Sequence, residues 1–584
     1  MANDLELERK LSRVGRTERT GTDKIPLREI EGLEWREFVD EEIGRIVIPE
    51  QLSLSITDSN IHAYIPESRR DAVAIGDYVV IPLGYQAQRI FARIESLAYI
   101  KRNAIDDMNE VYTLVNADHI GEDEYIETAK LHPISMFGDD LKVSEVRYIP
   151  KPNTIVRRVA SEDEVKTGLD IPDDGLFLGY VAVNGETIEV SGGIYVPYYL
   201  RNDPDRTGDP LIFIHTLIAG MSGRGKTHVA KNFLRQIVGS TYRLERRGGV
   251  ERKPCIVVID PENEYHMMSE AGLIEVEDRK ALLAQGVKIG GIGNSLRVFA
   301  AVEHGARYRG ADRYTPFTIP FELVDEFPYM IAGGDLNESQ YDALVMLVKV
   351  FFGREGDHRY ADFQAFIQDN ELMERYAEQG TIHPATFKAL RRRVDKPHFA
   401  RIFDQDGGNP ITELYEEMFD EDIVSVFPTD HLSATAERVM VLTVMSMIAD
   451  AKTRTVDRPW GRRIARYPII LAVDEAHNYL TSLDTQQDKA IAEKFVNAAK
   501  QGRKNRLGLV LISQNPQDIN EGVLSQISNR ILLGMERKMA EKAGAPPEYQ
   551  RALPYFERGR MIVHSPDNSH PLEIIGLKFC VVKH

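Results

Sequence analysis

A glycine-rich stretch at residues 220–227, GMSGRGKT, contains residue types that bind phosphate groups. Its spacing matches G-x-x-x-x-G-K-[ST], in which glycines let the backbone approach phosphate oxygens and direct successive N–H groups toward them. In this pattern the Lys226 ammonium contacts the β- and γ-phosphates, a catalytic role, and the Thr227 hydroxyl binds Mg²⁺. We therefore predict a site for ATP and Mg²⁺. Its predicted cofactor-binding residues in this stretch are Gly220, Met221, Ser222, Gly223, Arg224, Gly225, Lys226, Thr227 and His228.

Two adjacent carboxylates end the apolar run IILAVDE at residues 469–475. In nucleotide hydrolases the first acid of such a pair holds the Mg²⁺ shell and the second polarises the attacking water. Adjacent side chains on a strand point to opposite faces, so the strand must end before both acids can serve one site. We predict Asp474 as a metal residue and Glu475 as a catalytic residue. The alternative is a pair of acids that caps the next helix.

Two further runs end in polar residues that could face the same ligand. VVIDPENEY carries Asp260 and Glu264, which we predict to bind the cofactor because open α/β sheets bind ligands at the carboxyl ends of their strands. A capped turn is the alternative. LGLVLISQN ends at Ser513 and Gln514, and the uncharged Gln514 amide could sense the γ-phosphate or water without adding charge.

A cationic cluster, AAKQGRKNR at residues 498–506, precedes that last run. An arginine that reaches a neighbouring subunit's nucleotide stabilises the charge of the transition state. On chemistry alone a solvated face is an equal alternative for this cluster.

The elements around these residues alternate between strand-like and helical patterns. A polar, turn-rich boundary at residues 201–210 is followed by apolar runs separated by helical stretches, which predicts a parallel α/β sheet. Residues 211–219 are predicted as a strand, with His215 as a structural residue inside it, and residues 227–238 as an amphipathic helix. Residues from about 322 to 420 show helical patterns only, which predicts an insertion. Strands return over about 559–584.

The N-terminal part of the chain has a different residue pattern. Residues 1–40 are polar and are predicted to be an arm, whereas residues 41–200 contain short β-branched runs broken by Gly, Pro, Asn and Asp. That pattern is typical of a small β-barrel, here with linking strands. Residues 201–584 are then the α/β domain.

The composition excludes several classes of protein. With 584 residues, 43% hydrophobic and 28% charged, the chain is folded rather than disordered and holds more than one structural unit. Cys255 and Cys580 lie in apolar runs and cannot make a disulfide framework. The charged N-terminus and the lack of a long apolar run predict a cytoplasmic protein without a membrane partner. The formal net charge of −18 argues against a surface that binds polyanions everywhere.

The set GMSGRGKT, DPENEY, VDEAHNYL and QGRKNRLGLVLISQNPQDINEGVLSQISN resembles the HerA family of the HerA–FtsK class of DNA-pumping ATPases, over about residues 210–565. The N-terminal GRIVIP, IGDYVVIPLG and QRIFARIESL resemble that family's HAS-barrel. The resemblance implies a RecA-like P-loop ATPase domain and a homohexameric ring that threads double-stranded DNA using ATP. It also implies Arg503 as the trans-acting catalytic arginine and Gln514 as the catalytic sensor.

The chain departs from the family pattern at two positions. Arg224 stands where the family has a small residue, and Asn515 replaces the arginine of SQRP. Neither change removes a catalytic group. The resemblance further implies a partner in trans, either a nuclease of the NurA type in DNA end processing and repair or an effector enzyme in antiphage defence.

Three locally basic segments are candidates for DNA contact: residues 241–253, 388–401 and 452–466. Six copies of a modest patch would line a ring with positive charge, and contacts from Lys and Arg to phosphates would be independent of sequence. Ordinary solvated surface is the alternative for each segment.

The leading prediction is therefore an ATP-driven DNA translocase or helicase. An ATP-gated ring scaffold that activates a bound effector without moving along DNA has the same motifs and stays open as the alternative. A membrane-anchored DNA pump is a third possibility that the missing transmembrane run disfavours.

Overall fold

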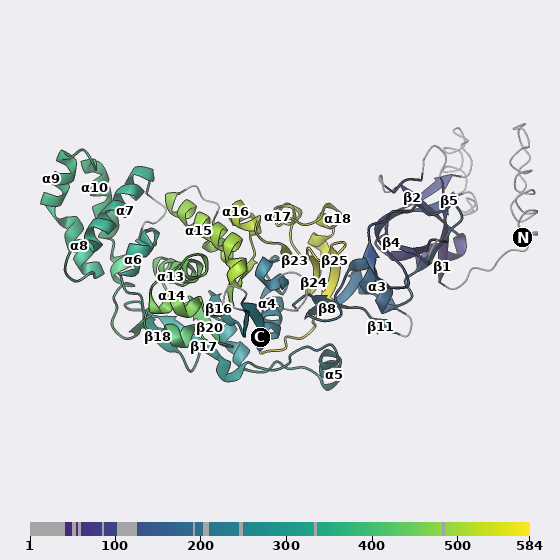
Figure 1. Cartoon of the computed structure of the whole chain (residues 1–584), viewed down its shortest axis with the longest axis horizontal. Helices are drawn as coiled ribbons and strands as arrows, with labels where there is room; N and C mark the ends of the chain where they lie inside the picture. The colour runs from purple at the N-terminus through teal and green to yellow at the C-terminus, as the bar shows by residue number, and fades with distance from the viewer. Residues whose placement is uncertain are drawn as a thin grey trace, which may run out of the picture.

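The computed structural model of the chain describes residues 41–48, 54–56, 60–84, 87–101, 125–190, 193–202, 210–244, 249–331, 336–481 and 485–584. The predicted arm, residues 1–40, lies outside these ranges. A small barrel stands at one end of the molecule, a large sheet covered by helices in the middle, and a helical lobe at the other end (Figure 1).

The barrel is antiparallel and closed. Its strand order is β2-β1-β7-β3-β4-β5-β6, and closure comes from a second pairing of β2 with β5. Alternate residues of β2, such as Ile61 and Ile65, point into a core that also contains Val79 and Ile90. The predicted small β-barrel is confirmed. Its strands are β1 (Glu42–Val47), β2 (Ile61–Ile65), β3 (Tyr78–Pro82), β4 (Arg89–Lys101), β5 (Tyr125–Phe137), β6 (Val143–Ser144) and β7 (Ile155–Arg158).

The large sheet has a parallel part with the order β23-β13-β22-β21-β16-β20-β17-β18-β19. Every residue of β16, β20, β21 and β22 is buried, which is why these strands appear in the sequence as unbroken apolar runs. The predicted parallel α/β sheet is confirmed. Its strands are β13 (Thr216–Ala219), β16 (Cys255–Asp260), β17 (Leu296–Ala301), β18 (Thr315–Thr318), β19 (Asn409–Pro410), β20 (Val424–Pro428), β21 (Ile469–Val473), β22 (Leu507–Ser513) and β23 (Asn529–Leu533).

The sheet continues beyond β23 with antiparallel strands, in the order β23-β24-β25-β8-β12. The sequence predicts residues 176–200 as part of the N-terminal β region, whereas the structure pairs β8 with β25 of the large sheet. Gly179 permits this pairing, since a β-carbon there would lie 2.1 Å from the Ile575 carbonyl oxygen. These strands are β8 (Leu176–Val183), β9 (Glu186–Thr187), β12 (Pro197–Leu200), β24 (Arg560–His564) and β25 (Leu572–Gly576).

Helices cover both faces of the sheet and form the separate lobe (Figure 1). The lobe is held by aromatic packing around Phe321 and Phe351. The other helices are α3 (Glu162–Leu169), α4 (Lys226–Ile237), α5 (Val276–Ala284), α13 (Ala434–Thr453), α14 (Pro459–Ile464), α15 (Gln486–Gly502), α16 (Glu521–Leu524), α17 (Arg537–Lys542) and α18 (Pro547–Gln550). Those of the insertion are α6 (Leu323–Glu326), α7 (Glu338–Phe352), α8 (Tyr360–Gln368), α9 (Asn370–Glu378), α10 (Pro384–Val394), α11 (Pro397–Ala400) and α12 (Tyr415–Met418).

Two details differ from or add to the sequence prediction. Residues Leu211–Ile214 form a 3-10 helix rather than a strand, and β13 begins only at Thr216. The backbone turns at His215, whose φ is 67°, so this residue precedes the strand. Within the described ranges, no helix combines the length and the apolar character needed to cross a bilayer.

Candidate nucleotide site

The glycine-rich loop connects the carboxyl end of β13 to the amino end of α4. Gly223 and Gly225 have φ values of 75° and 95°, in the left-handed region that glycine adopts without strain. Apolar residues of α4 are buried against the sheet, which fixes the direction of its axis. The free N–H groups of its first turn and its positive dipole end therefore face the loop, as a phosphate site requires.

Lys226 begins α4 and its side chain is largely buried. Its ammonium lies 3.4 Å from the Met221 carbonyl oxygen, so it curls over the loop. Burial lowers the pKa of Lys226, while the nearby carboxylates of Glu475 and Asp474 act in the opposite direction. The lysine is thus placed between the loop and the predicted acids.

Two other loop residues have contacts outside the loop. The Arg224 guanidinium donates to the Phe556 carbonyl oxygen at 2.8 Å, so this large side chain leaves the phosphate cradle open. The His228 ring packs edge to face on His584, with centroids 5.7 Å apart, and burial lowers its pKa to about 4. His228 thus faces the C-terminal segment, and its contact with phosphate stays a prediction. Thr227 is half-buried in the first turn of α4.

Strand β21 ends at Val473, directly before Asp474 and Glu475. Glu475 has a left-handed φ of 47°, which turns the chain so that both acids can serve one side of the sheet edge. Asp474 accepts a hydrogen bond from the Glu475 N–H at 2.9 Å and from the Tyr265 hydroxyl at 3.0 Å. Burial raises the pKa of Asp474 to about 7, and the charge of Glu475 adds to this shift.

Glu475 is surrounded by groups from β22 and from its own turn. The Gln514 amide donates to Glu475 Oε1 at 2.5 Å, which places the predicted sensor beside the predicted catalytic acid. His477 Nδ1 lies 3.2 Å from Glu475 Oε2 and 3.1 Å from the Ser513 hydroxyl. His477 has no recognisable signal in the sequence, because only the turn after β21 brings it back toward Glu475.

Asp260 lies at the end of β16 and is fully buried. Its two oxygens accept the backbone N–H groups of Glu264 and Tyr265, at 3.0 and 2.8 Å. Burial raises the pKa of Asp260 to about 6. These bonds are those of a capped turn, the alternative that the sequence left open. The turn holds Tyr265, which in turn bonds Asp474, so Asp260 supports the site through Tyr265.

A second lysine of α4, Lys231, is fully buried near the same acids. Its ammonium lies 5.8 Å from the centre of the Tyr265 ring and 3.4 Å from His584 Nδ1. Burial lowers the pKa of Lys231, and the charges of Glu264, Asp260 and Asp474 oppose that shift. Lys231 therefore lies behind the acid cluster, within range of the charges of its carboxylates. Its sequence signal was only its spacing of one helical turn from Thr227.

Arg503 lies at the amino ends of the parallel strands, away from the glycine-rich loop at their carboxyl ends. It follows α15 and precedes β22, which runs parallel to β13 with Ser513 opposite Ala219. Its charge acts on His215, the residue before β13, which places it at the amino ends of the strands. The length of β22 separates it from its own glycine-rich loop by roughly 20 Å at 3.3 Å per residue. Arg503 therefore cannot reach the nucleotide site of its own chain.

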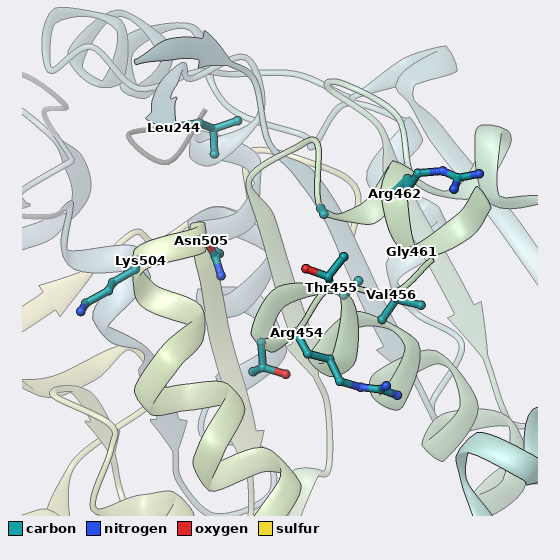
Figure 2. A pocket seen from close by; sticks show the side chains of 11 residues that line it. Leu244, Arg454, Thr455, Val456, Gly461, Arg462, Lys504 and Asn505 are labelled. Atoms are coloured by element: carbon teal, nitrogen blue, oxygen red, sulfur yellow. The ribbon is translucent and has the colours of Figure 1, made fainter. Parts of the chain in front are cut away.

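A cavity of about 360 Å³ also lies at the amino ends of the strands (Figure 2). Lys504 and Asn505 border it on one side, and Arg454 and Arg462 on the other. In Figure 2 the Lys504 and Arg462 side chains extend away from each other. Since the glycine-rich loop is at the carboxyl ends of the strands, this cavity is no part of the nucleotide site.

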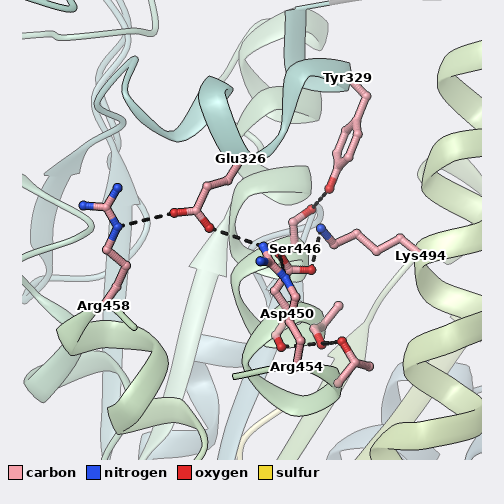
Figure 3. A network of polar contacts seen from close by, with 9 residues as sticks. Glu326, Tyr329, Ser446, Asp450, Arg454, Arg458 and Lys494 are labelled. Atoms are coloured by element: carbon pink, nitrogen blue, oxygen red, sulfur yellow. Dashed lines mark hydrogen bonds and ion pairs between the residues drawn. The ribbon is translucent and has the colours of Figure 1, made fainter. Parts of the chain in front are cut away.

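The three basic segments carry many cations that are paired within the chain. In residues 452–466, Arg454 contacts Asp450 and Glu326, and Arg458 also pairs with Glu326 (Figure 3). Lys452 is buried on backbone carbonyl oxygens. In residues 388–401, Arg391 donates to two carbonyl oxygens and to Asn370. In residues 241–253, Arg252 and Lys253 face Glu421 and Asp422. Most of these cations stabilise the fold locally.

The donor set fits a nucleotide with a divalent cation. Asp474 and Asp260 have raised pKa values because their charges are buried, and Glu475 lies beside them. A cation bound at Asp474 and Thr227 would relieve that cost, since Mg²⁺ prefers hard oxygen ligands. Lys226 and the N–H groups of α4 are placed for the phosphates.

Comparison with known proteins agrees with this geometry. Residues 207–448 match the family model of the central domain of the helicase HerA. A DNA double-strand break repair helicase HerA from Sulfurisphaera tokodaii is 30% identical over 106 residues, which is 18% of this chain and 21% of that protein. A probable helicase from Methanocaldococcus jannaschii is 24% identical over 331 residues, 55% of this chain and 56% of that protein. The matches thus span about a fifth to about half of these relatives.

Among solved structures, VirB4 of Thermoanaerobacter pseudethanolicus matches with a TM-score of 0.42 and 17% identity, over 70% of this chain and 98% of that one. The plasmid coupling protein TrwB in complex with ADP and Mg²⁺ matches with a TM-score of 0.43 and 11% identity, over 68% of this chain and 96% of that one. Residues 207–448 are therefore similar to the central domain of the HerA helicase family, and the relatives that match over shorter stretches include several HerA helicases.

Proposed function

We propose that this protein is an ATP-hydrolysing DNA translocase or helicase that works in the cytoplasm as a homohexameric ring. The observation that carries the proposal is the meeting of Lys226, Glu475 and Gln514 at one edge of the sheet, with the Gln514 amide bonded to Glu475. This is the arrangement that hydrolysis of a nucleoside triphosphate needs. The family match supports DNA as the substrate that is moved.

The chain's own groups divide the chemistry between them. The N–H groups of the glycine-rich loop and the Lys226 ammonium bind and orient the phosphates. Thr227 and Asp474 would hold Mg²⁺, which when bound neutralises phosphate charge. Glu475 orients the attacking water and accepts its proton, and Gln514 and His477 fix the position of the Glu475 carboxylate.

The position of Arg503 supports a ring. Since it cannot reach its own nucleotide, its proposed catalytic role requires a neighbouring copy whose glycine-rich loop faces it. A homohexamer meets that requirement, because every subunit then has one neighbour on each side.

We also propose a partner enzyme in trans, a nuclease of the NurA type or a defence effector. The support for a partner is the similarity to HerA proteins that are named as DNA double-strand break repair helicases. Isolation of the native complex with no such enzyme bound, together with no stimulation of added nuclease, would argue against it.

The direct test is ATP hydrolysis with and without duplex DNA. We expect DNA to stimulate hydrolysis, and Lys226→Ala and Glu475→Gln each to remove it, with a loss on the order of 10²-fold or more for a group that acts in the transition state. Glu475→Gln should still bind nucleotide. Lys542→Ala is the control, because Lys542 pairs only with Glu521 on the surface among the described residues.

Displacement of a triplex-forming strand from duplex DNA separates the motor from the scaffold. A translocase displaces the strand in an ATP-dependent reaction, whereas an ATP-gated scaffold hydrolyses ATP and leaves the triplex intact. Hydrolysis without displacement would therefore favour the scaffold.

A further inference from the structure

The loop between β17 and β18, residues 302–314, follows a strand that ends at the same sheet edge as the nucleotide site. Strand β17 pairs with β20, and β20 pairs with β16, whose last residue is Asp260 (Figure 1). Because these strands are parallel, the loop emerges two strands away from Asp260 on the same side. We call residues 302–314 the β17–β18 loop.

The base of the β17–β18 loop is held in place by buried polar contacts. The Glu303 carboxylate accepts hydrogen bonds from the Ser433 N–H and hydroxyl, both at 2.7 Å, at the start of α13. The Arg401 guanidinium donates to the His304 carbonyl oxygen at 2.8 Å. These bonds give the loop a rigid platform.

The middle of the loop is attached to the turn that follows Asp260. Tyr308 is buried, and its hydroxyl donates to the Asn263 side-chain oxygen at 2.8 Å. The Tyr308 ring also packs on His431, with centroids 5.2 Å apart. Gly310 approaches so closely that a β-carbon there would lie 2.0 Å from the Asn263 amide. The loop and the Asn263 turn are thus one packed unit.

Three arginines project from this platform. Arg307, Arg309 and Arg313 are exposed, and within the part of the chain that the structure describes they form no hydrogen bond or ion pair. The contrast is with the basic segments above, where cations such as Arg454 and Arg458 face carboxylates. Guanidinium groups that lack an internal partner are available to an external anion.

We propose that the β17–β18 loop binds the DNA phosphate backbone through Arg307, Arg309 and Arg313 and passes that contact to the nucleotide site through Tyr308 and Asn263. The proposal rests on the proposed function and names the regulatory route of its hydrolytic site. Asn263 belongs to the turn whose N–H groups hold Asp260, and that turn presents Tyr265 to Asp474. When DNA binds the three arginines and shifts the loop, the Asn263 turn moves with it. The hydrogen bond from Tyr265 to Asp474 then changes.

The first test is DNA binding by the triple variant Arg307→Ala, Arg309→Ala, Arg313→Ala, measured by fluorescence anisotropy with labelled duplex DNA over a range of salt. We expect binding weaker by about tenfold or more, and a salt slope reduced by roughly 2 to 3, because each phosphate contact releases one counterion. The matched control replaces three exposed cations that lie outside the three basic segments and have internal partners: Arg354, Lys542 and Lys583. It makes the same change in net charge and should bind like the unmodified chain.

The second test is Tyr308→Phe, which keeps the ring and removes the hydroxyl that donates to Asn263 and accepts from the Ala311 N–H at 3.1 Å. We expect DNA affinity to stay within about twofold, since the arginines remain, and the stimulation of hydrolysis by DNA to fall about fivefold or more. Tyr242→Phe is the matched control, because Tyr242 is also buried and donates to Asn202 away from the loop.

The outcomes separate this proposal from the proposed function. If the triple variant binds DNA like the unmodified chain, or if Tyr308→Phe is stimulated like Tyr242→Phe, the loop does not have this role, while the motor function stands. If the unmodified chain neither binds DNA nor hydrolyses ATP, both proposals are wrong.

Discussion

Asp474 depends on Tyr265 for its position. The Tyr265 ring is fully buried, its N–H is fixed by Asp260, and its hydroxyl donates to Asp474 Oδ2. A hydrogen bond to a charged, buried group contributes about 1.5–3 kcal/mol. The tyrosine thus binds one oxygen of the Asp474 carboxylate and fixes the orientation of that carboxylate for the proposed metal contact.

Tyr265→Phe should weaken the use of Mg²⁺ without removing nucleotide binding. We expect the Mg²⁺ concentration for half-maximal hydrolysis to rise about tenfold, since each 1.4 kcal/mol is a factor of ten. The measurement is a Mg²⁺ titration of ATPase activity. Tyr198→Phe is the control, because Tyr198 is buried and donates to Asn568 outside the site. An equal shift in both variants would mean that Tyr265 acts only through general stability.

His215 makes the stability of the protein depend on pH. It accepts from the Leu509 N–H at Nδ1, and Nε2 lies 2.9 Å from the Ala499 carbonyl oxygen, which requires the neutral ring with its proton on Nε2. Burial lowers the pKa of His215 to about 4. Since the unfolded ring has the ordinary pKa near 6.5, the unfolded state binds more protons between these values. The contribution to stability is therefore complete above pH 6.5 and is lost as the pH falls toward 4.

Acidification from pH 7 to pH 4 should lower the free energy of unfolding by about 3 kcal/mol through this residue. Urea unfolding at the two pH values measures it. In His215→Gln the difference between the two pH values should shrink by that amount, even though the variant is less stable at pH 7. His398→Gln, at an exposed position of α11, should leave the difference unchanged. An unchanged difference in His215→Gln would contradict the assignment.

At the scale of elements, the ATPase sheet is completed by strands from before the glycine-rich loop. Strand β25 is buried over its first three residues and pairs with β24 on one side and with β8 on the other. Without β8 and β12, the backbone groups of β25 would form an open edge next to Leu572 and Ile574. An unpaired apolar edge of this kind promotes aggregation.

A fragment of residues 171–584 should therefore be more stable than one of residues 201–584. The shorter fragment begins at the boundary that the sequence predicts for the α/β domain, yet it lacks β8 and β12. We expect it to aggregate or to unfold at a lower temperature, as size-exclusion chromatography and thermal unfolding would show. Equal stability of the two fragments would mean that β8 is dispensable to the sheet.

At the scale of the whole molecule, the two ends of the parallel strands carry different parts of the proposed mechanism. The glycine-rich loop, Glu475 and Gln514 lie at the carboxyl ends, and Arg503 lies at the amino ends. In the proposed ring, a complete site therefore combines the carboxyl ends of the strands of one copy with the amino ends of the strands of its neighbour.

Mixing two inactive variants tests this division. Lys226→Ala and Arg503→Ala should each lose hydrolysis. In a ring assembled at random from equal amounts of both, about a quarter of the interfaces combine an intact Lys226 from one copy with an intact Arg503 from its neighbour. The mixture should therefore recover about a quarter of the unmodified activity. ATPase activity of the mixture after reassembly measures it. A mixture of Lys226→Ala with Glu475→Gln should recover no activity. Both residues belong to the part of the site at the carboxyl ends of the strands, so every copy in that mixture has a defective nucleotide site. No recovery in the first mixture would contradict a trans role for Arg503.

The local chemistry could be predicted from residue spacing alone. The spacing of residues 220–227 specifies a phosphate loop, because glycine positions and the start of a helix decide the backbone there, and the end of an apolar run before Asp474 specifies a strand end. The parallel sheet and the barrel followed from the same local patterns. These features depend on residues that are close together in the chain, and the spacing of apolar and polar residues is therefore enough to predict them.

Which distant residues come together could be seen only in the folded chain. It brought the Tyr265 hydroxyl to Asp474 and the Tyr308 hydroxyl to Asn263, assigned β8 to the ATPase sheet, and paired Arg454 and Arg458 with carboxylates. It also placed Arg503 at the far edge from its own loop. The physical reason is that strand order and side-chain pairing are settled by packing across long separations in the chain, whereas a sequence pattern reveals burial and turns without naming the partner.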